Sequence, residues 1–271
     1  MQPKQSEMKK ATSRYIQFFS LEGMWGGKAN INWQHINEDV NILVGINGAG
    51  KTTLLNALYA YYTGKGIKKQ EGIASGSTLE GASIFYIRSF DVPSNVKRSS
   101  NSPLMEELEN LVIKNKYSYS FFDYRMRALN FPEESKTVNA RIEKFIVLVN
   151  TFFGETKKRM EIDRQENSLM FIDDSNNHQK ITLGQLSAGE KQMLLILLTV
   201  FLMDSKPAIL LMDEPELSLH VTWQEKLITS IRKLNPNCQL ILTTHSPSIF
   251  ALGWEDKLVF TEDIITLTNG K

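Results

Sequence analysis

Three short and almost uninterrupted apolar runs constrain the fold most strongly: Val40–Val44, Ala208–Met212 and Gln239–Thr243. Strands that are buried on both faces read as continuous apolar runs, and they occur in parallel sheets covered by helices. Thr52–Tyr62 and Val221–Leu234 carry apolar residues at helical spacing between these runs. Strands that alternate with helices predict an α/β fold with a mostly parallel central sheet.

Other segments complete the expected outline. We expect strands at Tyr15–Ser20, Ala29–Trp33, Ser83–Ile87, Lys257–Phe260 and Ile264–Leu267, helices at Leu104–Ile113, Arg141–Phe153 and Gln192–Met203, and a hairpin of Leu169–Asp173 with Gln179–Leu183. The two earliest strands predict an N-terminal antiparallel β part. The predicted division is a core of residues 1–63 and 161–271 with a mixed helical insertion at 64–160.

Composition excludes several classes of protein. With 31 basic and 30 acidic residues among 271, the chain cannot be a bulk polycation that coats nucleic acid. The hydrophobic content of 42% excludes a wholly disordered chain. One cysteine, Cys238, excludes an intramolecular disulfide. The longest apolar run, Met193–Met203, is short of the roughly 20 residues that span a bilayer. The N-terminus has no apolar signal-peptide core, and a cytoplasmic location is expected.

Charge is unevenly distributed along the chain. Residues 64–160 carry 16 basic and 11 acidic residues, a net +5, whereas residues 161–271 carry 9 and 15, a net −6. Such charges commonly solvate exposed faces. The alternative is a basic surface for an acidic partner such as nucleic acid, with clusters that comprise Lys65, Lys68, Lys69, Arg125, Arg127, Lys157, Lys158 and Arg159.

The first motif, Gly45–Thr52, reads GINGAGKT and matches G-x-x-x-x-G-K-[ST] between an expected strand and an expected helix. Glycines let the backbone N–H groups surround an anion, and the following helix adds its positive end. Lys51 is expected to reach the β- and γ-phosphates, and the Thr52 hydroxyl is expected to bind Mg²⁺. A plain glycine-rich turn before a helix is the alternative.

The second motif, Leu186–Gln192, precedes the apolar helix. Ser187 and Glu190 have the spacing of a capping box, which by itself explains a helix start. Two further motifs follow buried strands. Asp213 and Glu214 end one strand and His245 follows another, at the sheet edge where open parallel sheets bind ligands.

Together, and in this order, the motifs resemble the ABC-type ATPase family. Gly45–Thr52 is similar to Walker A, Leu186–Gln192 to the ABC signature and Ile209–Glu214 to Walker B with its catalytic glutamate, while His245 is similar to the switch histidine. The sequence DEPELSLH, from Asp213 to His220, is similar to the corresponding motif of the RecF/SMC-like and OLD-like branch of this family, also written AAA15 or AAA21. It differs from the motif that transporter subunits usually have at this place.

The resemblance implies ATP and Mg²⁺ as cofactors. Catalysis is implied for Glu214, His245 and Lys51, and Mg²⁺ ligation for Thr52 and Asp213. Nucleotide contacts are implied for Asn47, Gly48, Ala49, Gly50, Lys51, Thr52, Thr53, Ser187, Gly189 and Glu190.

The implied function is an ATPase that forms a head-to-tail homodimer around ATP. Such a chain would control a separate effector, such as a nuclease or toxin, in antiphage defence or DNA maintenance, with nucleic acid open as a further ligand. Two alternatives stay open: the nucleotide-binding subunit of an ABC membrane transporter, and a module that uses ATP only to assemble.

Several features depart from the branch. No glutamine follows Ser83–Ile87, where the branch has one near Mg²⁺, and Arg88 stands there instead. Val221 replaces the proline that commonly follows the motif histidine. No sustained heptads occur between the first two motifs, and no nuclease constellation is visible. Lys28 and Trp25 are candidates for further nucleotide contacts.

Overall fold

The computed structural model describes residues 12–65, 72–89, 102–113, 119–163, 165–166 and 168–268. At its centre lies a five-stranded sheet in the order β13-β4-β12-β11-β7, in which every neighbouring pair is parallel. Its strands are β4 (Val40–Val44), β7 (Ser83–Ile87), β11 (Ala208–Asp213), β12 (Cys238–Thr243) and β13 (Leu258–Phe260). The α/β class with a parallel central sheet is confirmed.

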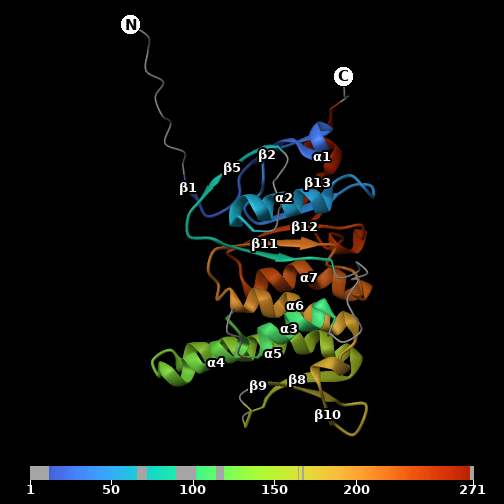
Figure 1. Cartoon of the computed structure of the whole chain (residues 1–271). Helices are drawn as coiled ribbons and strands as arrows, with labels where there is room; N and C mark the ends of the chain where they lie inside the picture. The colour runs from blue at the N-terminus through green and yellow to red at the C-terminus, as the bar shows by residue number, and fades with distance from the viewer. Residues whose placement is uncertain are drawn as a thin grey trace.

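A four-stranded antiparallel sheet, in the order β14-β3-β2-β5, lies with α2 (Lys51–Thr63) on one side of the central sheet (Figure 1). It comprises β2 (Phe19–Gly23), β3 (Ala29–Trp33), β5 (Ile73–Gly76) and β14 (Ile265–Leu267), and a small parallel pair joins β1 (Thr12–Ser13) to β6 (Thr78–Leu79). The expected antiparallel β part is confirmed, although β2 begins at Phe19 instead of Tyr15.

Helices and a third sheet cover the other side (Figure 1). These are α3 (Pro103–Val112), α4 (Phe121–Asn130), α5 (Ser135–Phe153), α6 (Ala188–Leu202) and α7 (Val221–Leu234), with the antiparallel sheet of β8 (Lys158–Asp163), β9 (Ser168–Asp173) and β10 (Gln179–Ile181) at the far end. The shorter elements are α1 (Met24–Gly27), α8 (Thr261–Ile264), η1 (Gly154–Thr156), η2 (Leu183–Gln185), η3 (Pro247–Ile249) and η4 (Glu255–Lys257). Within the described ranges, no helix is long and apolar enough to cross a bilayer.

The central sheet separates two apolar cores. Ile209 and Leu211 of β11 belong to the core with α2 and the antiparallel sheet, whereas Leu210 and Met212 belong to the core with the helices. This follows from the period-two alternation of side chains along a strand. Helix α6 is apolar almost all round because helices and sheet enclose it, and Gln192–Phe201 is buried throughout.

The segment 64–160 contributes to both sides of the molecule. Its strand β7 pairs with β11 in the central sheet, and β5 pairs with β2 in the antiparallel sheet. Its helices α3, α4 and α5 share the larger core with α6.

Candidate functional site

The loop from Gly45 to Gly50 joins the end of β4 to the start of α2. Gly48 and Gly50 have φ angles of +79° and +94°, a region that glycine enters without steric cost. Among the described residues, no side chain caps α2, so its first N–H groups have no side-chain acceptor there. A Cβ at Gly48 would meet open space, with no atom within 4 Å. The loop therefore fits a phosphate group at a helix N-terminus.

Lys51, the first residue of α2, lies folded back over this loop. Its Nζ donates to the carbonyl oxygens of Gly45 at 2.8 Å and Ile46 at 3.2 Å. Burial lowers the pKa of Lys51, while the carboxylates of Glu214 and Asp213 oppose that shift. An anionic ligand in the loop would be a better acceptor than the two carbonyl groups, because charge-assisted hydrogen bonds are stronger.

Asp213 ends β11 beside the loop and is held by two hydroxyl groups. Its Oδ1 accepts from Thr243 Oγ1 at 2.7 Å and from Thr52 Oγ1 at 3.2 Å. One carboxylate and one hydroxyl suit Mg²⁺, which takes few protein oxygen ligands and completes its shell with waters and phosphate oxygens. The described residues contain no group of three or more His, Cys, Asp or Glu side chains placed to hold a metal.

Glu214 and His245 face each other at the same edge. His245 Nε2 lies 3.5 Å from Glu214 Oε1, and the two side chains are 40% and 30% exposed. Glu214 adopts a φ of +48°, and its N–H donates to Thr243 Oγ1 at 3.0 Å. A turn at the strand end thus directs a carboxylate toward solvent, where it can reach both a water molecule and the imidazole.

A third carboxylate, Glu216, was given no role by the sequence motifs. It is 8% exposed, and its Oε1 accepts from Thr244 Oγ1 at 2.6 Å and from the His245 N–H at 2.9 Å. The structure therefore makes Glu216 the group that orients the loop carrying His245. The sequence signal that could have identified Glu216 is its position two residues after Glu214, within the motif DEPE.

The signature segment starts α6 with the predicted capping box. Ser187 Oγ accepts from the Glu190 N–H at 3.2 Å, and Glu190 Oε2 accepts from the Ser187 N–H at 2.7 Å. Gly189 packs against Ser218, because a Cβ at Gly189 would lie 2.5 Å from the Ser218 carbonyl oxygen. No hydrogen bond between described residues joins the signature to the loop of Gly45–Gly50, hereafter the P-loop.

A pocket of about 300 Å³ lies beside the P-loop. Its lining comprises Trp25, Ile46, Asn47, Gly48, Ala49, Thr261, Glu262, Ile265 and Leu267. Trp25 is 40% exposed and reaches the space beside Gly50. The pocket thus brings Trp25 to the loop, whereas Lys28 is not among its lining residues and Arg88 lies over the Tyr86 ring at 5.1 Å.

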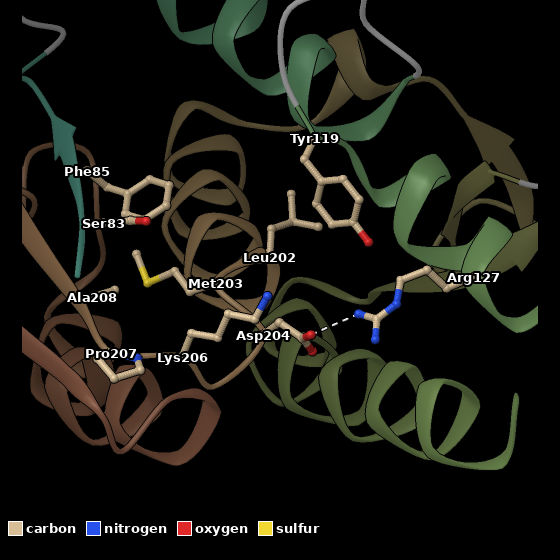
Figure 2. A pocket seen from close by; sticks show the side chains of 10 residues that line it. All are labelled: Ser83, Phe85, Tyr119, Arg127, Leu202, Met203, Asp204, Lys206, Pro207 and Ala208. Atoms are coloured by element: carbon tan, nitrogen blue, oxygen red, sulfur yellow. Dashed lines mark hydrogen bonds and ion pairs between the residues drawn. The ribbon is translucent and has the colours of Figure 1, made fainter. Parts of the chain in front are cut away.

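Three of the eight residues in the basic clusters of 64–160 form ion pairs within the chain. Lys158 pairs with Glu190 at 2.8 Å, and Arg159 pairs with Glu161 and Asp174. Arg127 pairs with Asp204 at 2.8 Å, and Figure 2 shows this ion pair in a pocket at the opposite end of β11 from Asp213. Lys65 and Lys157 are exposed, and Lys68 and Lys69 lie outside the described residues.

Several known proteins are similar to this chain in sequence. The sequence is 36% identical over 96 residues to the "Retron Ec83 probable ATPase" of Escherichia coli, covering 31% of this chain and 18% of that protein. It is 21% identical over 280 residues to the "Septu protein PtuA" of Bacillus thuringiensis, covering 83% of this chain and 70% of that one. The match thus spans less than a fifth of the retron protein's length.

Solved structures share the fold. The "SmcHead bound to the C-winged helix domain of ScpA" superposes with a TM-score of 0.58 at 12% identity, covering 94% of this chain and 97% of that one. The "SMC head domain from Thermotoga maritima" gives 0.50 at 16% identity, covering 95% and 99%. The family described as "AAA domain, putative AbiEii toxin, Type IV TA system" matches residues 87–251, more than half of the chain. The chain therefore belongs to this AAA21 family and has the fold of ABC- and SMC-type ATPase heads.

Proposed function

We propose that the chain is an ATP-hydrolysing switch that dimerises head to tail around ATP and controls a separate effector in antiphage defence. The observation that carries this proposal is the convergence of Lys51, Thr52, Asp213, Glu214 and His245 at one edge of the parallel sheet. These side chains come from three strand ends, which is where open parallel sheets bind and convert ligands.

Each group has a distinct task in this proposal. Thr52 and Asp213 would hold Mg²⁺, which would supply positive charge for the phosphate oxygens. Lys51 leaves its two carbonyl acceptors and binds phosphate. Glu214 orients an attacking water and takes its proton, and His245 beside it contacts the terminal phosphate. Trp25 and the neighbouring apolar residues of the P-loop pocket receive the base.

Head-to-tail pairing would complete the site with a second chain. Ser187 caps a 15-residue helix, and the N–H groups of Ala188 and Gly189 donate to no other described residue. Such a helix end attracts a phosphate. Since no described hydrogen bond joins Ser187 to its own P-loop, the partner's nucleotide is the proposed ligand. Loss of the terminal phosphate would then loosen the dimer.

The similarity to a retron ATPase and to PtuA supports defence over membrane transport. A soluble particle that co-purifies with an effector would support this choice, and co-purification with a membrane permease would contradict it. We place the effector contact on segment 64–160, whose exposed basic residues include Lys65 and Lys157. Charge reversal at both should weaken binding of an acidic partner, most strongly at low salt.

Mixing two inactive variants tests the composite site. Ser187→Arg blocks the signature, and Lys51→Ala disables the P-loop. A mixed head-to-tail dimer contains one intact site and one doubly damaged site. Equal mixing with random pairing should therefore restore about a quarter of wild-type turnover, because half of the dimers are mixed and each has one good site. No restoration from two folded variants would contradict the proposal.

A further inference from the structure

The carboxylate of Glu190 is buried and links two parts of the chain that are distant in sequence. It is 1% exposed. Its Oε1 accepts from Thr156 Oγ1 at 2.6 Å, and its Oε2 accepts from Lys158 Nζ at 2.8 Å. Thr156 ends η1 and Lys158 begins β8, and they precede Glu190 by 34 and 32 residues. Among the described residues, Lys158 is the only cation paired with this carboxylate.

Ser187 depends on the same carboxylate. Glu190 Oε2 accepts both the Lys158 ammonium group and the Ser187 N–H, and the Glu190 N–H donates to Ser187 Oγ. Burial raises the pKa of Glu190, but the hydrogen bonds from Lys158, Thr156 and Ser187 outweigh it and leave that pKa below its ordinary value. Without its cation, a buried carboxylate takes up a proton or turns toward water. Rotation removes the acceptor of the Ser187 N–H, and protonation weakens it because the charge-assisted hydrogen bond becomes a neutral one.

The segment that carries Lys158 is fixed on its other side as well. Glu155 accepts from Trp223 Nε1 at 2.8 Å and from Lys226 Nζ at 2.9 Å, and both donors lie on α7. Lys158 therefore projects from a segment anchored to the helical layer, and α6 is held against that anchor.

We propose that Lys158 is a positioning residue for the signature: through Glu190 it holds Ser187 and the start of α6 in the arrangement that engages the nucleotide of the partner chain. This inference rests on the composite site proposed above. It assigns Lys158, which the charge pattern had grouped with a partner-facing surface, to the ATPase cycle itself.

Three single variants separate this role from a general effect of charge. Lys158→Met removes the cation, Lys158→Arg keeps it, and Lys233→Met removes an exposed charge near the end of α7, outside segment 64–160. Lys158→Met should leave ATP binding by the monomer unchanged and lower turnover about tenfold or more, as expected when a buried ion pair loses one partner. Lys158→Arg should retain most turnover, and Lys233→Met should match the wild type. Equal losses in the two Met variants would contradict the inference.

Complementation gives the sharper result, because it reports which site a residue serves. Lys158→Met mixed with Lys51→Ala should regain activity to the same extent as Ser187→Arg mixed with Lys51→Ala. Lys158→Met mixed with Ser187→Arg should regain nothing, since both changes damage the signature. If Lys158 instead served the nucleotide bound to its own chain, the first mixture would stay inactive and the second would recover.

The two proposals fail in different ways. If the Ser187→Arg control pair recovers and the Lys158→Met pair does not, the role of Lys158 is overturned and the composite site stands. If the control pair itself fails with folded chains, the composite site falls and the inference falls with it. Should Lys158→Met not fold, Lys158→Met with Glu190→Gln removes both charges and enters the same mixtures, with recovery against Lys51→Ala expected.

Discussion

Two regions of the molecule use carboxylates in opposite ways: the P-loop edge, which comprises Lys51, Thr52, Asp213, Glu214 and His245, and the signature corner, which comprises Ser187, Glu190 and Lys158. Glu214 is 30% exposed, and its partner His245 lies 3.5 Å away and is 40% exposed. Glu190 is 1% exposed and paired at 2.8 Å with Lys158. A group that must act on water and phosphate needs room and access, whereas a group that presents a helix end needs a fixed place. We therefore expect changes at the P-loop edge to affect chemistry and changes at the signature corner to affect assembly.

The largest effect is expected at Glu214. Glu214→Gln keeps the size of the side chain and removes its basicity, so turnover should fall by about 10²–10⁴. ATP binding should persist, and the ATP-bound dimer should accumulate. Single-turnover hydrolysis and size-exclusion chromatography with ATP measure the two outcomes.

Lys51→Ala provides the contrast for that measurement. It removes a phosphate contact, so it should weaken ATP binding itself and leave no dimer to trap. Near wild-type turnover in Glu214→Gln would remove Glu214 from the role of base and would erase the distinction between the two regions.

A smaller effect is expected at Glu216, whose exposure of 8% lies between the 1% of Glu190 and the 30% of Glu214. Glu216→Ala leaves the buried Thr244 hydroxyl and the His245 N–H without their acceptor, at a cost of about 1–3 kcal/mol in unfolding free energy. Turnover should fall with it because His245 loses its orientation. Glu216→Gln keeps an acceptor oxygen and should cost less in both urea unfolding and turnover. Equal losses would indicate that the charge, and not the hydrogen bonding, matters.

Two glycines extend the comparison to the backbone. Gly189→Ala would place a Cβ 2.5 Å from the Ser218 carbonyl oxygen, so backbone must shift, at about 1–3 kcal/mol. Gly48→Ala meets open space but keeps a φ of +79°, at about 1–2 kcal/mol. Gly189→Ala should impair ATP-linked dimerisation, and Gly48→Ala should impair ATP affinity. ATP titration and sedimentation of each variant check this assignment.

Local patterns predicted the central sheet and the P-loop edge well. Val40–Val44 and Ser83–Ile87 were expected as strands with the bounds that the structure has, and Val221–Leu234 is a helix with the expected bounds. These elements can be predicted from the sequence because burial in a sheet, or on one face of a helix, requires apolar residues at regular spacing. Asp213 and His245 follow such strands, so the parallel order of the sheet alone brings them to one edge.

The signature corner depends on contacts that no local pattern reveals. β8 reads KRMEID, with four charged residues in six and only two apolar residues, too few for its alternation to stand out, so it was not expected as a strand. α4 was also missed, since its sequence FFDYRMRALN has a short and weakly apolar face. The pairing of Lys158 with Glu190 joins residues 32 apart and requires both β8 and the packed core. Charge counting could assign Lys158 only to a basic surface.

The smallest expected effect is a pH dependence of stability at Glu190. Because its pKa is lowered in the folded chain, Glu190 contributes stability that is fully present above the ordinary value of 4.5 and is lost as pH falls through the folded pKa. Glu190→Gln keeps an acceptor for Ser187 but loses the attraction to Lys158. The wild type should therefore exceed Glu190→Gln in unfolding free energy at pH 7, and the two should converge in acid.

In a Lys158→Met background the cation is absent, so the advantage of glutamate over glutamine at pH 7 should shrink. Urea unfolding of all four chains between pH 3 and pH 7, spanning the ordinary pKa, measures this coupling. If glutamate exceeded glutamine by the same unfolding free energy in both backgrounds, Lys158 would not stabilise the Glu190 carboxylate. The hydrogen bonds from Thr156 and Ser187 would then hold the signature corner without it.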